Sequence, residues 1–485
     1  MVKTNKSKNR RNRKNKGIRE EAAKARKINA STPYETCSEQ LSPFGGLLAM
    51  IKFFDLIGFK EIFHTAYCEP TRTPKLGHYS MVVGLLMLLF IGFNRIWHFT
   101  YIRLDAILCG FFRLTKLPVA STFWRYLDSM GINQAQSLLK FMSILRERVW
   151  QQLDLSYSRI SVDIDTTVET LYGNQQGGRK GHNRKHRGQK GYRPVLCFIE
   201  QTREYLIGKL RKGKTISGKQ TADFICQIKA YLPGCVKKVL LRADGEFQSW
   251  ECIQAAMKCG FDFIIASQKC AAPFEKDTWY RPWKRRDTEF NSCVYQPNGW
   301  EIPCRFVVMR IPNQQEQCVL FDEDAYTYRI FCTSLSSPAH KVIDEYDKRA
   351  DVENLVGEAK REGLEAIPST KFKNNYAFFQ LVMLSYNIWR YMKLLAAKSQ
   401  ESKNDQEQAS LRTVASNTIR IARLKMLFIA AKVVRVQNRD KVKYSVHEAR
   451  TPAVMRFLKF LDKARSKPKP WACGGLWPQR FALET

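Results

Sequence analysis

The chain has 485 residues, of which 44% are hydrophobic and 12% aromatic, which excludes a disordered protein and leaves room for two to four compact units. Its 80 Lys and Arg against 45 Asp and Glu give a formal net charge of +35. We expect the partner to be a polyanion, above all nucleic acid, and the alternative is a basic surface that only keeps the protein soluble. Fourteen cysteines without a CxxC pair and seven histidines indicate neither a zinc framework nor a disulfide scaffold, and they favour a reducing compartment.

Residues 1–29 contain 12 Lys and Arg against Glu20 and Glu21, which predicts a disordered basic arm. Such an arm strengthens DNA binding by releasing counterions, although a tail that only improves solubility has the same composition. No apolar segment follows it, so it is not a secretory signal. The longest apolar run, residues 81–93, is shorter than the roughly 18 to 20 residues that span a bilayer. We therefore expect a buried helix there, no membrane partner, and a cytoplasmic, nucleoid-associated protein.

Residues 30–153 show apolar clusters at helical spacing and predict a helical N-terminal DNA-binding domain. Within it, Ser121 is a candidate N-cap for a short helix that carries Trp124 and Arg125. This helix is either a recognition helix that places Arg125 on DNA or an ordinary packing helix with Trp124 in the core.

The remaining chain divides into four segments by its pattern. Residues 154–275 alternate short β-rich runs with helical stretches and predict the first part of an α/β core. Residues 276–337 are typical of a β-rich insertion, and residues 338–400 predict the second part of the core, with one long helix to about Gly363 and an apolar helix over residues 375–397. Residues 401–485 predict a basic helix and a hairpin that turns at residues 438–440.

Three carboxylates stand where a metal-dependent phosphodiester chemistry would need them. Asp165 and Asp244 each end a strand, and Glu353 lies within the long predicted helix. Two divalent cations about 4 Å apart activate the nucleophile and stabilise the leaving oxygen, and hard cations prefer carboxylate oxygens. These three residues are the candidate catalytic and metal-binding set, with Mg²⁺ expected and Mn²⁺ as the alternative.

Two of the three assignments have competitors. Strand alternation sends Asp163 and Asp165 to the same side, which is unusual for two charges unless a metal or solvent receives them. We favour Asp165 because it is closer to the open end of the strand, and Asp163 is the alternative. Asp244 precedes a Gly turn, where Asp is also common as a turn residue, and Glu246 is its nearby competitor.

Tyr346, Arg349, Glu353 and Lys360 follow one another at offsets of 3, 7 and 14 residues. On a regular α-helix these offsets fall within roughly 60° of arc, so one face presents an acid between two cations and a phenol. A metal-binding carboxylate among phosphate-gripping groups has this pattern, and a solvated surface helix with i, i+4 pairs has it too.

This four-residue spacing resembles the last motif of the DDE-type insertion-sequence transposases of bacteria, in the hairpin-forming branch. The first Asp is followed by Thr in DIDTT and the second ends the strand in LLRAD, as is common in that family. The resemblance implies a ribonuclease H-like catalytic core interrupted by the β-rich insertion, and Tyr346, Arg349 and Lys360 on DNA phosphates. It also implies double-stranded DNA as partner and a homodimer that synapses two DNA ends.

Other residues are candidates for DNA contact. The segment 177–193 carries seven Lys and Arg, five Gly and no acid, and it follows the Asp165 strand. Its DNA-binding candidates are Arg179, Lys180, Arg184, Lys185, Arg187 and Lys190. Its His182 and His186 lack a companion Cys pattern for a metal. Trp283 lies among aromatic and basic residues and is a candidate for stacking on an unpaired base, or else belongs to a β core.

A transposase therefore explains the charge, the carboxylates and the helix face together. Two alternatives stay open: a ribonuclease H-like nuclease without strand transfer, and an inactive DNA-binding derivative.

Overall fold

The computed structural model describes residues 26, 28–181, 183, 186–213, 218–267, 272–283, 285–312, 326–400 and 411–471. The chain forms two compact units, Met1–Gln40 and Leu41–Thr485. Within the first unit, the amide of Thr32 donates to the carbonyl of Asn29 (3.0 Å) in a turn. Most of the expected basic arm lies outside the described residues. The strand β1 (Gln40–Ser42) spans the boundary between the units.

The chain from Leu47 to Leu153 folds into helices. They are α2 (Leu47–Leu56), α3 (Phe59–Ala66), α4 (Gly77–Ile91), η1 (Ile96–His98), α5 (Phe99–Ile102), α6 (Ala106–Phe112), α7 (Ala120–Ser129) and α8 (Ile132–Leu153). Every residue of α4 from Met81 onward is buried, so the expected buried helix is confirmed. Among the described residues no single helix is long and apolar enough to cross a membrane; one pair, α4 with Ile96–Ile102, meets the length and composition criteria together but is bent by 90°.

The expected cap of α7 is wrong. The N-cap is Val119, whose side chain makes no capping hydrogen bond, and Ser121 lies inside the first turn. Pro118 precedes the cap and favours extended backbone ahead of the helix, which moves its start toward the proline. Trp124 is 37% exposed and does not belong to the core.

An eight-stranded sheet forms the centre of the second unit, in the order β10-β11-β12-β9-β8-β2-β6-β7. Its strands are β2 (Arg159–Thr166), β6 (Val195–Ile199), β7 (Glu204–Lys209), β8 (Lys238–Ala243), β9 (Asp262–Ser267), β10 (Glu289–Tyr295), β11 (Cys304–Pro312) and β12 (Tyr326–Thr333). The strands β2, β8 and β9 are parallel, and all other neighbours are antiparallel. The strands β10, β11 and β12 fall in the expected insertion and extend the sheet through β12 and β9.

Short elements surround the end of β2. A small sheet of order β3-β5-β4 contains β3 (Glu169–Thr170), β4 (Arg179–Lys180) and β5 (Lys190–Tyr192). The connections between sheet strands are α9 (Gly218–Ile228), η2 (Lys229–Tyr231), η3 (Gly245–Phe247), α10 (Trp250–Cys259) and η4 (Lys276–Thr278).

The long helix expected before Gly363 is broken into four segments. They are α11 (Ala339–Asp347), the 3₁₀ turn η6 (Lys348–Ala350), α12 (Asp351–Ala359) and the π turn η7 (Lys360–Leu364). Gly363 has φ 121°, a conformation open to glycine, which ends the α-helical geometry there. Because 3₁₀ and π turns rotate the chain differently from an α-helix, the regular spacing of one helix face does not extend over the whole segment.

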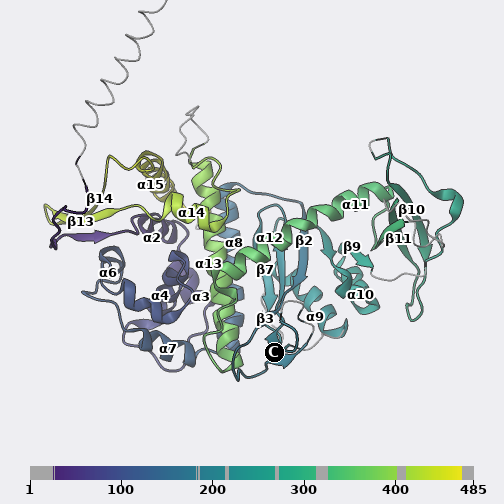
Figure 1. The fold of residues 1–485 in the computed structure, drawn as a ribbon, viewed down its shortest axis with the longest axis horizontal. Helices are drawn as coiled ribbons and strands as arrows, with labels where there is room; N and C mark the ends of the chain where they lie inside the picture. Colours follow the sequence, from purple (N-terminus) through teal and green to yellow (C-terminus); the bar gives the residue numbers. More distant parts are fainter. Residues whose placement is uncertain are drawn as a thin grey trace, which may run out of the picture. The chain divides into compact units, whose positions relative to one another are not determined.

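The apolar helix α13 (Phe372–Lys398) confirms the one expected over residues 375–397 and joins the two halves of the unit. It packs against α8, α4 and β7 (Figure 1). Trp389 of α13 stacks on Phe90 with ring centroids 4.0 Å apart and donates to the Phe90 carbonyl (3.0 Å). The N-terminal helices and the sheet therefore share one hydrophobic core.

The C-terminal region contains α14 (Ile419–Met426), β13 (Ala431–Val436), β14 (Arg439–Tyr444) and α15 (Thr451–Arg465). The expected hairpin is present, but its turn is at Gln437 and Asn438, with φ 50° and 57°, and Arg439 and Asp440 belong to β14. Two consecutive positive φ values match a two-residue type I′ turn, which Asn favours.

Candidate active site

Asp165 and Asp244 lie at the ends of neighbouring parallel strands. The register of β2 on β8 pairs Ile164 with Ala243, and the residue that follows in each strand's sequence is an aspartate. Adjacent strands are about 4.8 Å apart, which places the two carboxylates side by side at the carboxyl edge of the sheet. Asp244 also caps η3, because its Oδ1 accepts a hydrogen bond from the Glu246 amide (3.1 Å).

Asp163 has a different environment from Asp165. Both of its carboxylate oxygens accept hydrogen bonds from Arg242, at 2.7 and 2.9 Å, and it is 3% exposed. Arg242 is fully buried and also reaches Glu200 (3.0 Å) and the Glu345 carbonyl (2.7 Å). A bidentate guanidinium neutralises the charge of Asp163 within the core, so the first acid of SVDID is accounted for without a metal.

Arg349 connects η6 to the end of β2. Its Nη2 donates to the Ile164 carbonyl (3.0 Å) and to Asp165 Oδ1 (3.1 Å). The residue is 6% exposed, and its Nε has no hydrogen-bond partner within the described residues. Arg349 is thus buried against an aspartate, and the expected contact with DNA phosphates stays a prediction.

The electrostatics of the site connect all three candidate acids. The pKa of Asp165 is raised to about 6, mainly by burial and also by the Asp244 and Glu353 carboxylates, against the lowering effect of Arg349. Burial also raises the pKa of Asp244, against the lowering effect of Arg349. Glu353 lies in the first turn of α12 and its side chain is exposed. Three like charges close enough to perturb one another are the arrangement in which a cation is stabilising.

The three acids do not form a closed set of ligands. Across the described ranges, no group of three or more His, Cys, Asp and Glu side chains lies close enough together to hold a metal ion. Asp165 is instead ion-paired with Arg349, and Glu353 extends into solvent. The structure therefore brings Asp165 and Asp244 to one edge of the sheet, and the place of Glu353 beside them in a metal site stays a prediction.

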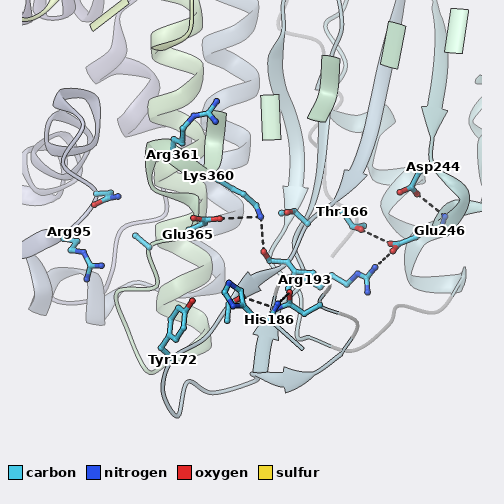
Figure 2. A pocket seen from close by; sticks show the side chains of 16 residues that line it. Arg95, Thr166, Tyr172, His186, Arg193, Asp244, Glu246, Lys360, Arg361 and Glu365 are labelled. Atoms are coloured by element: carbon cyan, nitrogen blue, oxygen red, sulfur yellow. Dashed lines mark hydrogen bonds and ion pairs between the residues drawn. The ribbon is translucent and has the colours of Figure 1, made fainter. Parts of the chain in front are cut away.

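A cavity of about 590 Å³ is lined by Asp244 and by Thr166, the residue after Asp165. Figure 2 shows dashed lines from the Glu246 carboxylate to Thr166 and to Arg193, and Lys360 directed toward Glu365. Glu246 accepts a hydrogen bond from the Thr166 hydroxyl (2.8 Å) and one from Arg193. Glu246, the expected competitor of Asp244, is thus part of an ion pair in the cavity wall.

The wall of this cavity carries cations from three separate parts of the chain. Lys360 donates to the Val168 carbonyl (3.1 Å) and forms an ion pair with Glu365 (3.6 Å). The lining also includes Arg95, Arg193 and Arg361. Arg193 is the last cation of the basic segment 177–193, whereas nothing in the local sequence distinguishes Arg95 and Arg361 from the many other basic residues.

Glu169 is a further residue that the sequence did not indicate. It is 1% exposed beneath Lys360, its Oε1 has no partner among the described residues, and burial raises its pKa to about 8 while Lys360 lowers it. A largely protonated carboxyl there leaves more of the positive field of Lys360 available to the cavity.

The other expected DNA contacts lie at the surface. Arg179 and Lys180 in β4, Arg187, Lys190 and Arg125 are exposed, and His186 lines the cavity. Trp283 is 82% exposed, with the Arg286 guanidinium 4.5 Å from its ring centre, so it does not belong to a β core. Tyr346 packs against Phe331 (4.5 Å) and lies 5.9 Å from the Arg349 guanidinium. His182, Arg184 and Lys185 lie outside the described residues.

These elements define a class of site in which two aspartates lie at the carboxyl edge of a buried α/β sheet, beside a basic cavity. A family model described as "Transposase DDE domain group 1" matches residues 23–466, and the chain belongs to this family. A solved structure of the piggyBac transposase synaptic complex with hairpin DNA aligns with a TM-score of 0.40 and 11% identity, covering 79% of this chain and 81% of that one. No curated protein matches the chain.

Proposed function

We propose that this transposase cuts and joins phosphodiester bonds at the ends of an insertion sequence, with Asp165, Asp244 and Glu353 as its catalytic carboxylates. The observation that carries the proposal is the parallel register of β2 and β8, which brings Asp165 and Asp244 to the same sheet edge. Family membership and the net charge of +35 support DNA as the substrate.

The strands β7-β6-β2-β8-β9 are proposed to be a ribonuclease H-like core. Three antiparallel strands are followed by two parallel ones, and the acids lie at the central strand β2 and its neighbour β8. Ligands of α/β sheets bind beyond the carboxyl ends of the parallel strands, which is where these aspartates lie.

The residues present fit divalent cations by their chemistry. Carboxylate oxygens are the ligands that Mg²⁺ and Mn²⁺ prefer, and mutual repulsion with Asp244 and Glu353 contributes to the raised pKa of Asp165. Asp165 and Asp244 would hold the metal from the sheet, and Glu353 would join from α12. When bound, the metal supplies an activated nucleophile and charge stabilisation at the leaving oxygen.

The surrounding side chains position the acids and the DNA. Arg349 orients Asp165 through its two hydrogen bonds and keeps positive charge within the site. Lys360, Arg95 and Arg361 line the cavity and are proposed to hold phosphates of the DNA end. Tyr346 and the exposed cations of β4 are proposed to extend that contact. The active form is proposed to be a homodimer that synapses two ends of double-stranded DNA in the cytoplasm.

Purified protein incubated with Mg²⁺ and linear duplexes that carry the element's own ends tests this function. We expect breaks at the ends, closed hairpin ends on a denaturing gel, and products joined to a target DNA. Breaks without joined products would indicate a nuclease, and binding without breaks an inactive derivative.

A further inference from the structure

A second cavity, of about 670 Å³, lies among the N-terminal helices. We call it the cationic pocket. Its cations are Arg72, Lys75, Arg103, Lys116 and Arg125, and its other lining residues include Leu76, Met81, Leu117, Pro118, Thr122 and Tyr126. Four of the five cations are exposed and Arg103 is half-buried.

The five cations of the cationic pocket have no acidic partner among the residues that the structure describes. Its lining contains no Asp or Glu, and none of its five cations forms an ion pair with any described residue. Arg103 is fixed by a hydrogen bond from its Nε to the Leu117 carbonyl (2.9 Å). Five unpaired cations around one cavity repel one another, and a bound polyanion relieves that repulsion.

The inner wall of the cationic pocket is preformed. The Tyr126 hydroxyl is within 3.3 Å of both the Tyr67 hydroxyl and His78 Nδ1, and Tyr126 is buried. Leu117 and Met81 are buried beside it. An apolar floor below a rim of cations suits a sugar-phosphate chain, which has one apolar and one anionic side.

We propose that the cationic pocket binds the phosphodiester backbone of double-stranded DNA, as an anchor separate from the carboxylate site. Five cations exceed the charge of one phosphate, which favours several successive phosphates over a single small anion. The neighbours Leu104 and Trp124 are 76% and 37% exposed and are available to contact sugars or bases. This inference rests on the proposed function, since it takes the same DNA as the substrate.

A chain of contacts connects this anchor to the catalytic end of the sheet. Asp128, in the last turn of α7, accepts hydrogen bonds from Lys371 (2.8 Å) and Asn374 (2.8 Å) at the start of α13. The Gln176 amide, beyond β3, donates to the carbonyl of Thr370 (2.7 Å), the residue before Lys371. DNA held at α7 is thus held by an element that is fixed relative to the loops after Asp165.

The test is a DNA-binding measurement in EDTA on two charge-reversal variants of the full chain. One variant combines Lys116→Glu with Arg125→Glu in the cationic pocket. The matched control combines Lys237→Glu with Lys238→Glu, which makes the same charge change at the exposed start of β8, one strand length or roughly 20 Å from Asp244. The probe is a fluorescently labelled duplex of unrelated sequence, titrated at several salt concentrations.

We expect the pocket variant to lose about tenfold or more in affinity. Its affinity should also depend less on salt: the negative slope of log K against log salt should become less steep by about two, because two phosphate contacts are lost. The control should change the affinity about twofold or less. Equal losses in both variants would mean a general effect of charge, and no loss in the pocket variant would mean that DNA does not bind there; either overturns the inference.

Two further measurements separate the possible failures. Lys116→Gln with Arg125→Gln should show a smaller loss of the same kind, and unchanged thermal unfolding of each variant excludes misfolding. Millimolar inorganic phosphate should compete weakly with the duplex; if it displaces the duplex as effectively as unlabelled DNA does, the pocket takes single anions and the inference is wrong. Binding is measured without metal, so it is tested independently of cleavage. A wild-type protein that binds DNA through this pocket but never cleaves it would contradict the proposed function and still support DNA binding at the pocket.

Discussion

Arg349 donates a 3.1 Å hydrogen bond to the carboxylate of Asp165, so the segment that carries Glu353 is attached directly to the strand that carries the first aspartate. The same guanidinium lowers the pKa of Asp165 and of Asp244, and it is therefore the common counter-charge of both. This relationship places Arg349 among the acids, although its spacing from Tyr346, Glu353 and Lys360 in the sequence predicts a residue directed at DNA.

Replacing Arg349 tests its role as a positioning residue. Arg349→Ala should lower cleavage and strand joining at least tenfold, because Asp165 loses its fixed orientation, while divalent metal still binds. Arg349→Lys keeps the charge but not the planar fork and should recover only part of the activity. Single-turnover rates and Mn²⁺ binding provide the readouts. An unchanged rate of strand joining in Arg349→Ala would show that the residue is only structural.

Removing an acid should abolish the chemistry and leave DNA binding intact. We expect Asp244→Ala and Glu353→Ala each to reduce Mg²⁺-dependent cleavage to background, since these carboxylates act on the metal and not on the DNA sequence. Affinity for DNA in EDTA should change little. The matched control is Asn354→Ala, which alters the exposed neighbour of Glu353 on α12 and should cleave normally. Retained cleavage in either acid variant would reject its assignment.

Asp163 should matter for folding. Asp163→Asn removes a carboxylate charge that pairs with two nitrogens of the Arg242 guanidinium, while Glu200 stays as a partner of Arg242. Losing charged hydrogen bonds of this kind costs about 1.5–3 kcal/mol of unfolding free energy. Urea denaturation should show that loss, and the double variant Asp163→Asn with Arg242→Met should recover part of it. Full stability of Asp163→Asn would contradict the distinction between the two acids of β2.

Asp165 should make stability depend on pH with the opposite sign to an ordinary ion-paired carboxylate. Its pKa is raised from 3.8 to about 6, so the folded state binds a proton that the unfolded state has released, and stability falls as pH rises between these values. Asp165→Asn removes this penalty, which is at most on the order of 3 kcal/mol. Thermal unfolding should therefore show the variant more stable than wild type above about pH 6, with the difference shrinking toward about pH 4. An equal difference at every pH would contradict the assignment.

Much of this architecture can be predicted from the sequence because the signal comes from residues that are neighbours in the chain. The buried α4, the hairpin of β13 and β14 and the apolar α13 each have a continuous signal, and VLLRAD shows both the strand and the acid that ends it. Long-range pairing gives no such signal. The attachment of β12 to β9 and the Arg242 partner of Asp163 depend on residues far apart in the chain.

The helix that carries Glu353 shows a different limit. Spacing alone predicts one regular helix face, but a 3₁₀ turn at Lys348–Ala350 and a π turn at Lys360–Leu364 change the rotation between its residues. Such turns depend on what the segment packs against, here the end of β2 through Arg349 and Lys360. The sequence therefore offers candidate acids, whose roles stay a prediction, whereas it gives no sign that Arg349 is buried.

The central claim is that Asp165, Asp244 and Glu353 share divalent cations, and cutting of the backbone by bound iron tests it most directly. Wild-type protein in complex with duplex DNA is treated with Fe²⁺, ascorbate and peroxide, so that radicals formed at the metal cleave the nearest peptide bonds. We predict fragments that end near all three acids, suppressed by excess Mg²⁺ or Mn²⁺ and lost in Asp244→Ala. Cleavage at other places, or cleavage near only one acid that Mg²⁺ does not suppress, would contradict the shared site.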